Sequence, residues 1–129
     1  MTPAYKHASL TNAIISTFYF VYNSLGFGFL EKVYENALAH ELRKRGHRVV
    51  QQAKITVYYD QVVVGEYYAD LLVDDLVILE IKAAVSIAEE HEIQLLNYLK
   101  ATDYEVGLLL NFGKLPEIKR KIFESARKR

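Results

Sequence analysis

Cysteine is absent from the 129-residue sequence. This absence excludes disulfides, thiolate nucleophiles and cysteine-based zinc or iron–sulfur sites, and it is compatible with a reducing compartment. Any metal ion would therefore be bound through oxygen or histidine.

Long apolar runs are also absent. The most apolar stretch, Ala13 to Tyr22, is interrupted by Ser16 and Thr17 and is too short to cross a bilayer. No basic segment followed by a small-residue cleavage site indicates a signal peptide. We therefore expect a cytoplasmic protein with no membrane partner.

The sequence also has no excess of charge of either sign, because 16 acidic residues balance 16 basic ones and the formal net charge is zero. Global charge therefore indicates no nucleic-acid or membrane partner. Phosphate binding needs local basic clusters, and such runs occur, although the first also suits a helix C-terminus and the last a frayed tail. These basic residues are Arg43, Lys44, Arg45, His47 and Arg48, then Lys119, Arg120 and Lys121, and finally Arg127, Lys128 and Arg129.

What the sequence does contain is enough apolar material, 51% of its residues, for one compact domain over residues 1–129. Apolar residues three and four apart predict an N-terminal helix over about residues 8–24, with Thr11 or Asn12 as its N-cap. A second helical stripe begins at Phe29 and ends at Gly46, a typical C-terminal cap. The core of the domain is expected over about residues 28–123.

The middle of the chain predicts three strands. Asp60–Gln61 and Asp74–Asp75 are turn-forming pairs between apolar runs, and Gly65 marks a bulge. An antiparallel meander follows, then a helix, a strand covered on both faces and a last strand. The predicted ranges are Val49–Tyr59, Val62–Leu72, Leu76–Lys82, Glu89–Thr102, Val106–Phe112 and Ile118–Phe123. This order indicates an α+β fold with a mixed central sheet flanked by helices.

Three ionisable residues interrupt the predicted strands. Glu80 and Lys82 share one face of their strand, and the turn before it brings Asp70 across from Glu80. Buried charges need pairing, protonation or a cation, and two adjacent carboxylates suit Mg²⁺ or Mn²⁺. Lys82 would then orient or deprotonate water, or stabilise charge on a phosphate. The alternative is a structural ion pair between Glu80 and Lys82, with Asp70 merely ending a strand.

Two predicted helices carry further candidates. Glu31 and Tyr34 lie three apart on the second helix, and Gln94 and Tyr98 are adjacent on the later one. His91, one turn before Gln94, either approaches the site or braces the helix start. Glu31 is alternatively a solvated first-turn acid, and Gln94 with Tyr98 a pair at the core margin.

These motifs, taken in order, resemble the PD-(D/E)XK nuclease superfamily. They are Glu31 on a helix, Asp70, Glu80-x-Lys82, and Gln94-x-x-x-Tyr98 on a following helix. The last is similar to the RecB-like branch. More narrowly, "GFLEKVYENALAHELRKRGHRV" and "VGEYYADLLVDDLVILEIKA" look like the GxxExxY family of small bacterial and archaeal proteins.

The resemblance implies a restriction-endonuclease-like αβββαβ core preceded by an extra N-terminal helix. Asp70, Glu80 and the main-chain carbonyl of Ile81 would hold a divalent cation, with Glu31 as an additional ligand. Lys82 would position or activate water. Gln94 and Tyr98 would contact DNA backbone or brace the metal site.

The sequence departs from the family pattern at four positions. The superfamily's proline before the aspartate is Ala69 here. Relatives usually have histidine at Tyr22, proline at Phe27 and arginine at Tyr68. Without the arginine, a potential phosphate contact would be missing, whereas the residues that the resemblance implies as metal ligands are all present.

The leading hypothesis is therefore a Mg²⁺- or Mn²⁺-dependent nuclease acting on nucleic acid, with DNA preferred. The alternative is a catalytically silent module that binds nucleic acid or protein on the same fold. A third hypothesis is a subunit that is active as a homo-oligomer, because exposed tyrosines and an apolar first helix suit an interface.

Overall fold

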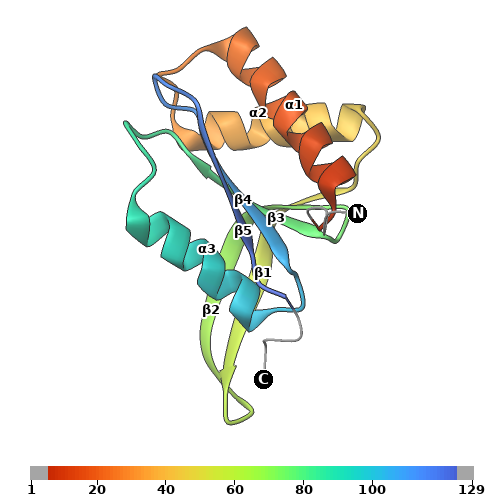
Figure 1. The fold of residues 1–129 in the computed structure, drawn as a ribbon, viewed down its shortest axis with the longest axis vertical. Coiled ribbons are helices and arrows are strands. Elements are labelled where there is room, and N and C mark those ends of the chain that lie inside the picture. Colours follow the sequence, from red (N-terminus) through yellow and green to blue (C-terminus); the bar gives the residue numbers. More distant parts are fainter. Residues whose placement is uncertain (1–5, 125–129) are drawn as a thin grey trace.

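The computed structural model describes residues 6–124 of the chain (Figure 1). Three helices and five strands follow the predicted order. They are α1 (Ala8–Leu25), α2 (Glu31–Lys44), β1 (Val49–Tyr59), β2 (Val62–Val73), β3 (Val77–Lys82), α3 (Glu89–Ala101), β4 (Val106–Asn111) and β5 (Glu117–Ile122). No helix within these residues is both long and apolar enough for a membrane span.

The five strands form one mixed sheet in the order β1-β2-β3-β4-β5. The first three pair antiparallel, as the meander predicts, and β5 pairs antiparallel with β4. β3 and β4 are parallel, and the chain between them passes through α3. A helical crossover of this kind is how parallel neighbours are usually connected.

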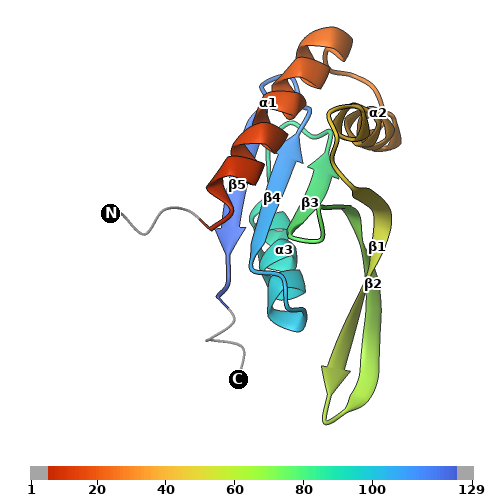
Figure 2. The same cartoon turned by 90° about the vertical axis from the view of Figure 1, so that its right-hand side faces the viewer.

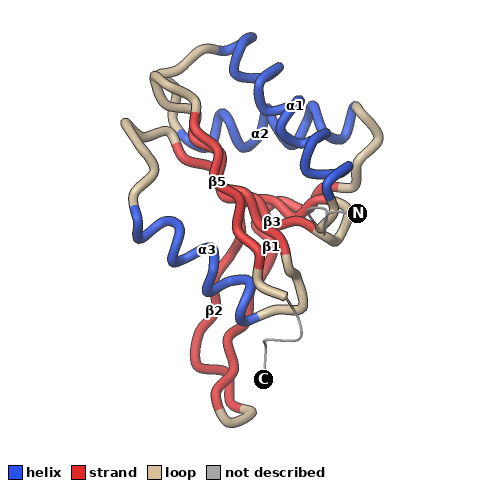
Figure 3. Tube along the Cα trace, in the orientation of Figure 1, coloured by secondary structure: helices blue, strands red, loops and turns tan. Residues whose placement is uncertain are grey.

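Helices cover both faces of the sheet, which gives three layers (Figures 2 and 3). Side chains of α1 and α2 pack on one face with Leu71, Leu79 and Leu108. Side chains of α3 pack on the other face with Ile78 and Leu109. Because β3 and β4 are covered on both faces, their apolar residues are almost continuous and fully buried.

The two long strands β1 and β2 extend beyond the rest of the sheet as a hairpin (Figure 2). We call residues 53–69 of it the hairpin arm. Asp60 and Gln61 form its turn, and both have left-handed backbone, with φ of 52° and 64°. The register shifts between Val57 and Tyr58, next to Gly65, so the predicted bulge is present.

The predicted N-cap of α1 and the predicted start of α2 are wrong. Helix α1 begins at Ala8, and the Thr11 hydroxyl donates to the Ala8 carbonyl (3.1 Å) inside the first turn, so neither Thr11 nor Asn12 is the N-cap. Helix α2 begins at Glu31, because the Phe29 N–H donates to the Tyr34 hydroxyl (3.1 Å) instead of entering the helix. The C-terminal end agrees with the prediction, since Gly46 is left-handed with φ of 96°.

Candidate functional site

The candidate site lies where β2 and β3 separate. Their ladder pairs Leu71 with Leu79 and stops there. At the next level the Asp70 N–H donates to Glu80 Oε2 (2.9 Å), and the Ile81 N–H donates to Asp70 Oδ2 (2.7 Å). Each carboxylate therefore occupies the place of a missing ladder bond, and the two acids lie side by side as predicted.

Burial makes this carboxylate pair unusual. Glu80 is only 5% exposed. Burial, followed by the charge of Asp70, raises the pKa of Glu80 to about 8, although the Asp70 N–H and the charge of Lys82 act in the opposite direction. Burial also raises the pKa of Asp70, and the charge of Glu35 adds to it. Because two buried acids repel each other as anions, a divalent cation between them would remove this cost.

The donor set fits Mg²⁺ or Mn²⁺. These ions take oxygen ligands and are usually held by one or two carboxylates, with water and substrate phosphate completing the shell. Within residues 6–124, no group of three or more His, Cys, Asp or Glu side chains is arranged to hold a metal ion. The two candidate ligands that the structure brings side by side are the carboxylates of Asp70 and Glu80. Ligation by Glu31 and by the Ile81 carbonyl stays a prediction.

Lys82 ends β3 on the same side of the strand as Glu80. Its positive charge lowers the pKa of both carboxyl groups, which indicates that its ammonium lies near them. Its side chain is partly exposed and forms no ion pair with a carboxylate of the described residues. The ammonium is therefore available to a water molecule or a phosphate.

Helix α3 brings Tyr98 to the same carboxylates. Tyr98 is 6% exposed, and burial together with the charges of Glu80 and Asp70 raises its pKa to about 12. Gln94 Nε2 donates to the Tyr98 hydroxyl (3.0 Å), which confirms that the two side chains are adjacent. Both line a groove between α3 and the hairpin arm, with Tyr58 and Tyr67 on the opposite wall.

The other predicted residues have different surroundings. His91 braces the start of α3, because its Nδ1 accepts the Ala88 N–H (3.2 Å). Tyr34 is fully buried and donates to the Gly26 carbonyl (2.7 Å), which anchors the loop before α2. Glu31 is exposed in the first turn of α2, and its charge contributes to the raised pKa of Glu80.

Glu35 and Gln52 also adjoin the carboxylate pair, although the sequence did not predict either of them as a site residue. Glu35 is 4% exposed and accepts hydrogen bonds from Gln52 Nε2 (3.0 Å) and Gln51 Nε2 (2.9 Å). Gln52 Nε2 also lies 3.4 Å from Asp70 Oδ1. Two consecutive glutamines in a strand were the available signal, but their spacing does not indicate that they reach a helix.

Several side chains of the basic runs form hydrogen bonds or ion pairs within the protein. The Arg43 guanidinium donates to the Val49 carbonyl (2.9 Å), and Arg45 pairs with Glu41 (3.1 Å). Lys121 pairs with Glu92 on α3 (2.7 Å). Arg127, Lys128 and Arg129 lie outside the described residues.

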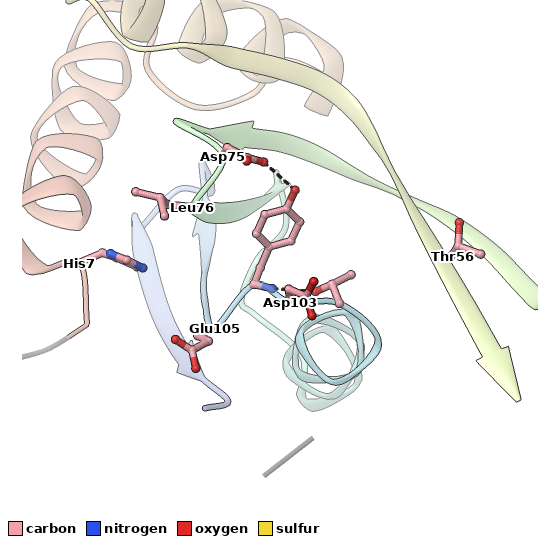
Figure 4. A pocket seen from close by; sticks show the side chains of 8 residues that line it. His7, Thr56, Asp75, Leu76, Asp103 and Glu105 are labelled. Carbon is pink, nitrogen blue, oxygen red and sulfur yellow. Dashed lines mark hydrogen bonds between the residues drawn. The ribbon is translucent and has the colours of Figure 1, made fainter. Parts of the chain in front are cut away.

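A separate hollow lies at the other end of β3 (Figure 4). Asp75, Asp103 and Glu105 line it, and the Tyr104 hydroxyl donates to Asp75 (2.8 Å). Asp75 precedes the first residue of β3, whereas Glu80 and Lys82 lie toward its last residue. This hollow is therefore distinct from the carboxylate pair.

A mixed five-stranded sheet between helices, with an acid pair at the fork of two strands, defines a restriction-endonuclease-like fold. The model of the PD-(D/E)XK nuclease superfamily matches residues 8–122, and the chain belongs to this superfamily. Comparison with curated proteins and with solved structures gave no match. The predicted superfamily and fold class are confirmed.

Proposed function

We propose that this protein is a metal-dependent nuclease that hydrolyses phosphodiester bonds, with DNA as its substrate, and that it belongs to the GxxExxY family in the RecB-like branch. The single observation that carries the proposal is the buried pair of Asp70 and Glu80 beside Lys82. Membership of the superfamily supports the reaction class.

In this proposal, the carboxylates of Asp70 and Glu80 and the carbonyl of Ile81 hold Mg²⁺ or Mn²⁺. The bound ion supplies Lewis acidity toward the phosphate and a water of lowered pKa. Lys82 orients the attacking water and balances negative charge on the phosphate. Gln94 and Tyr98 contact the nucleic-acid backbone at the rim of the site.

The experiment compares the wild type with Asp70→Ala, Glu80→Ala and Lys82→Ala on single- and double-stranded DNA with Mg²⁺ or Mn²⁺. We expect Lys82→Ala to lower the cleavage rate about 10²–10⁴-fold, because it removes a group that acts on water. Both acid variants should lose cleavage and Mn²⁺ binding together. Asp103→Ala, an exposed acid on the separate hollow, is the control and should cleave like the wild type.

Undiminished cleavage in all three site variants would reject the proposal. A second candidate is a catalytically silent module that binds nucleic acid or protein on the same fold. The internal pairing of Arg43, Arg45 and Lys121 favours a protein partner, because these side chains are less available to phosphates. DNA binding by the wild type without turnover under any metal condition would favour this second candidate.

A further inference from the structure

Strand β1 changes face at Gln52. Gln51 reaches α2, where its Nε2 donates to Asn36 Oδ1 (2.8 Å). Ala53, two residues later, belongs to the apolar cluster with α3 on the opposite face. A regular strand keeps residues two apart on one face. The exception coincides with left-handed backbone at Gln52, with φ of 54°.

Strand β2 changes face at the same level. Leu71 packs with α1 and α2, whereas Ala69 packs with α3. The residue between them is Asp70. Gln51 pairs with Leu71 and Ala53 pairs with Ala69, so Gln52 and Asp70 are opposite each other. The side chains of both strands therefore change face at the level of Asp70, the proposed metal ligand.

Left-handed backbone is costly for glutamine, by roughly 1–2 kcal/mol. The side chain indicates what this conformation provides. Gln52 Nε2 lies 3.0 Å from Glu35 Oε1 and 3.4 Å from Asp70 Oδ1, so the two amide hydrogens can serve two carboxylates. The other oxygen of Asp70 accepts the Ile81 N–H. Both oxygens of Asp70 are thus oriented by neighbours.

Glu35 is itself held in place. It accepts hydrogen bonds from Gln51 Nε2 and from Lys32 Nζ (3.1 Å). The connection between α2 and β1 therefore exists without Gln52. What Gln52 adds is the link from Glu35 to Asp70.

We propose that Gln52 is a positioning residue, anchored on buried Glu35, that fixes the orientation of the Asp70 carboxylate for metal binding. The inference rests on the proposed function. Groups that orient a metal ligand from behind typically contribute 10–100-fold to metal affinity.

The test is calorimetric titration of the full chain with Mn²⁺, using Gln52→Gly, Gln51→Ala, Asp70→Ala and the wild type. Glycine accepts the left-handed backbone, so Gln52→Gly removes the amide and keeps the turn. We expect its Mn²⁺ affinity to fall 10–100-fold while its unfolding midpoint in chelator stays close to that of the wild type. Gln51→Ala loses a bond to Glu35 but none to Asp70, and it should bind Mn²⁺ within about twofold of the wild type.

The outcomes separate the two proposals. Wild-type affinity in Gln52→Gly would overturn the role of Gln52, as would an equal loss in Gln51→Ala. If the wild type bound Mn²⁺ no better than Asp70→Ala, the metal site itself would be rejected, and this inference with it. Should Gln52→Gly fail to fold, Gln52→Asn provides the test, because asparagine tolerates left-handed backbone and its amide is one methylene shorter.

Discussion

At the residue scale, the acid pair at the fork of β2 and β3 is a buried pair of carboxylates whose ionisation reduces the stability of the metal-free fold. Asp70 and Glu80 accept main-chain hydrogen bonds, yet burial and mutual repulsion still raise the pKa of each. Between about pH 4.5 and pH 8, the cation-free folded protein therefore keeps a proton on Glu80 that the unfolded chain would release.

This linkage predicts how stability depends on pH. The pKa of Glu80 rises from 4.5 to about 8 on folding, so the metal-free protein loses stability as the pH increases through that range. Glu80→Gln carries no charge and should remain stable there. In chelator at pH 8.5, we expect its free energy of unfolding to exceed that of the wild type by at least about 1 kcal/mol.

Urea denaturation at pH 5 and at pH 8.5 measures this effect. The advantage of Glu80→Gln should shrink toward pH 5, where Glu80 is protonated in the folded wild type. Glu89→Gln, at an exposed position of α3, is the control and should show no such pH dependence. An equal advantage at both pH values would contradict the assignment to ionisation of Glu80.

The acid pair and Lys82 could be predicted from the sequence, whereas Gln52 and Glu35 could not. Alternation along β3 places Glu80 and Lys82 on one face, and the turn at Asp74–Asp75 returns the chain beside Asp70. Alternation fails at Gln52, because its backbone is left-handed. Glu35 has the spacing of an ordinary helix acid, and only the tertiary structure shows that it is buried.

At the scale of elements, the segment after β3 is held by the end of β4. The Asn111 side chain donates to the Ala84 carbonyl (3.0 Å) and accepts the Ala84 N–H (2.9 Å), as a strand neighbour would. The Phe112 N–H donates to the Lys82 carbonyl (2.8 Å). The position of the residues around Lys82 therefore depends on close packing at the end of β4.

Gly113 is the residue that permits this packing. A Cβ at Gly113 would lie 2.1 Å from the Ala84 carbonyl oxygen, which is main chain and cannot rotate away. We expect Gly113→Ala to reduce the free energy of unfolding by roughly 1–3 kcal/mol, as overpacking does. It should also slow any cleavage that depends on Lys82.

Denaturant unfolding of Gly113→Ala beside Gly65→Ala checks this. At Gly65 the nearest atom to an added Cβ is in the ring of the half-exposed Tyr67, 3.1 Å away, which can move. The control should therefore cost less than Gly113→Ala. Equal effects of the two substitutions would show that the approach of Gly113 to Ala84 has no special importance.

At the scale of the whole molecule, α1 is an integral part of the core rather than an addition to it. Phe18 is fully buried, and its ring lies 4.6 Å from that of Phe112 at the end of β4. Ile14 and Val21 belong to the same cluster as the α2 side chains. The helix should therefore unfold together with the sheet.

We expect Phe18→Ala to cost about 3–5 kcal/mol, as for other buried aromatic residues, and to lower the midpoint of one cooperative transition. Phe20→Ala removes the same side chain from a position that is 51% exposed, where it packs under Arg45, and should cost much less. Calorimetry of both variants measures this difference. A separate low-temperature transition in Phe18→Ala would show that α1 unfolds independently.

The overall architecture was accessible from the sequence because apolar periodicity persists in α2, α3 and β4. The order of elements and the mixed sheet followed from it. The N-cap of α1 and the start of α2 did not, since His7 and Leu30 precede these helices with no side-chain cap hydrogen bond. Where no side chain caps a helix, the sequence does not mark its first residue, and tertiary packing determines where the helix begins.

The side chains of β1 and β2 change face together at Gln52 and Asp70. The length of the hairpin arm is therefore independent of the arrangement of the acid pair. Beyond that level, side chains on the hairpin arm alternate with a period of two, except at the bulge between Val57 and Tyr58. Lengthening or trimming both arm strands by two residues would therefore move the tip at Asp60–Gln61 and leave the acids where they are. The length of the hairpin arm can therefore vary in steps of two residues without any change in the arrangement of Asp70 and Glu80.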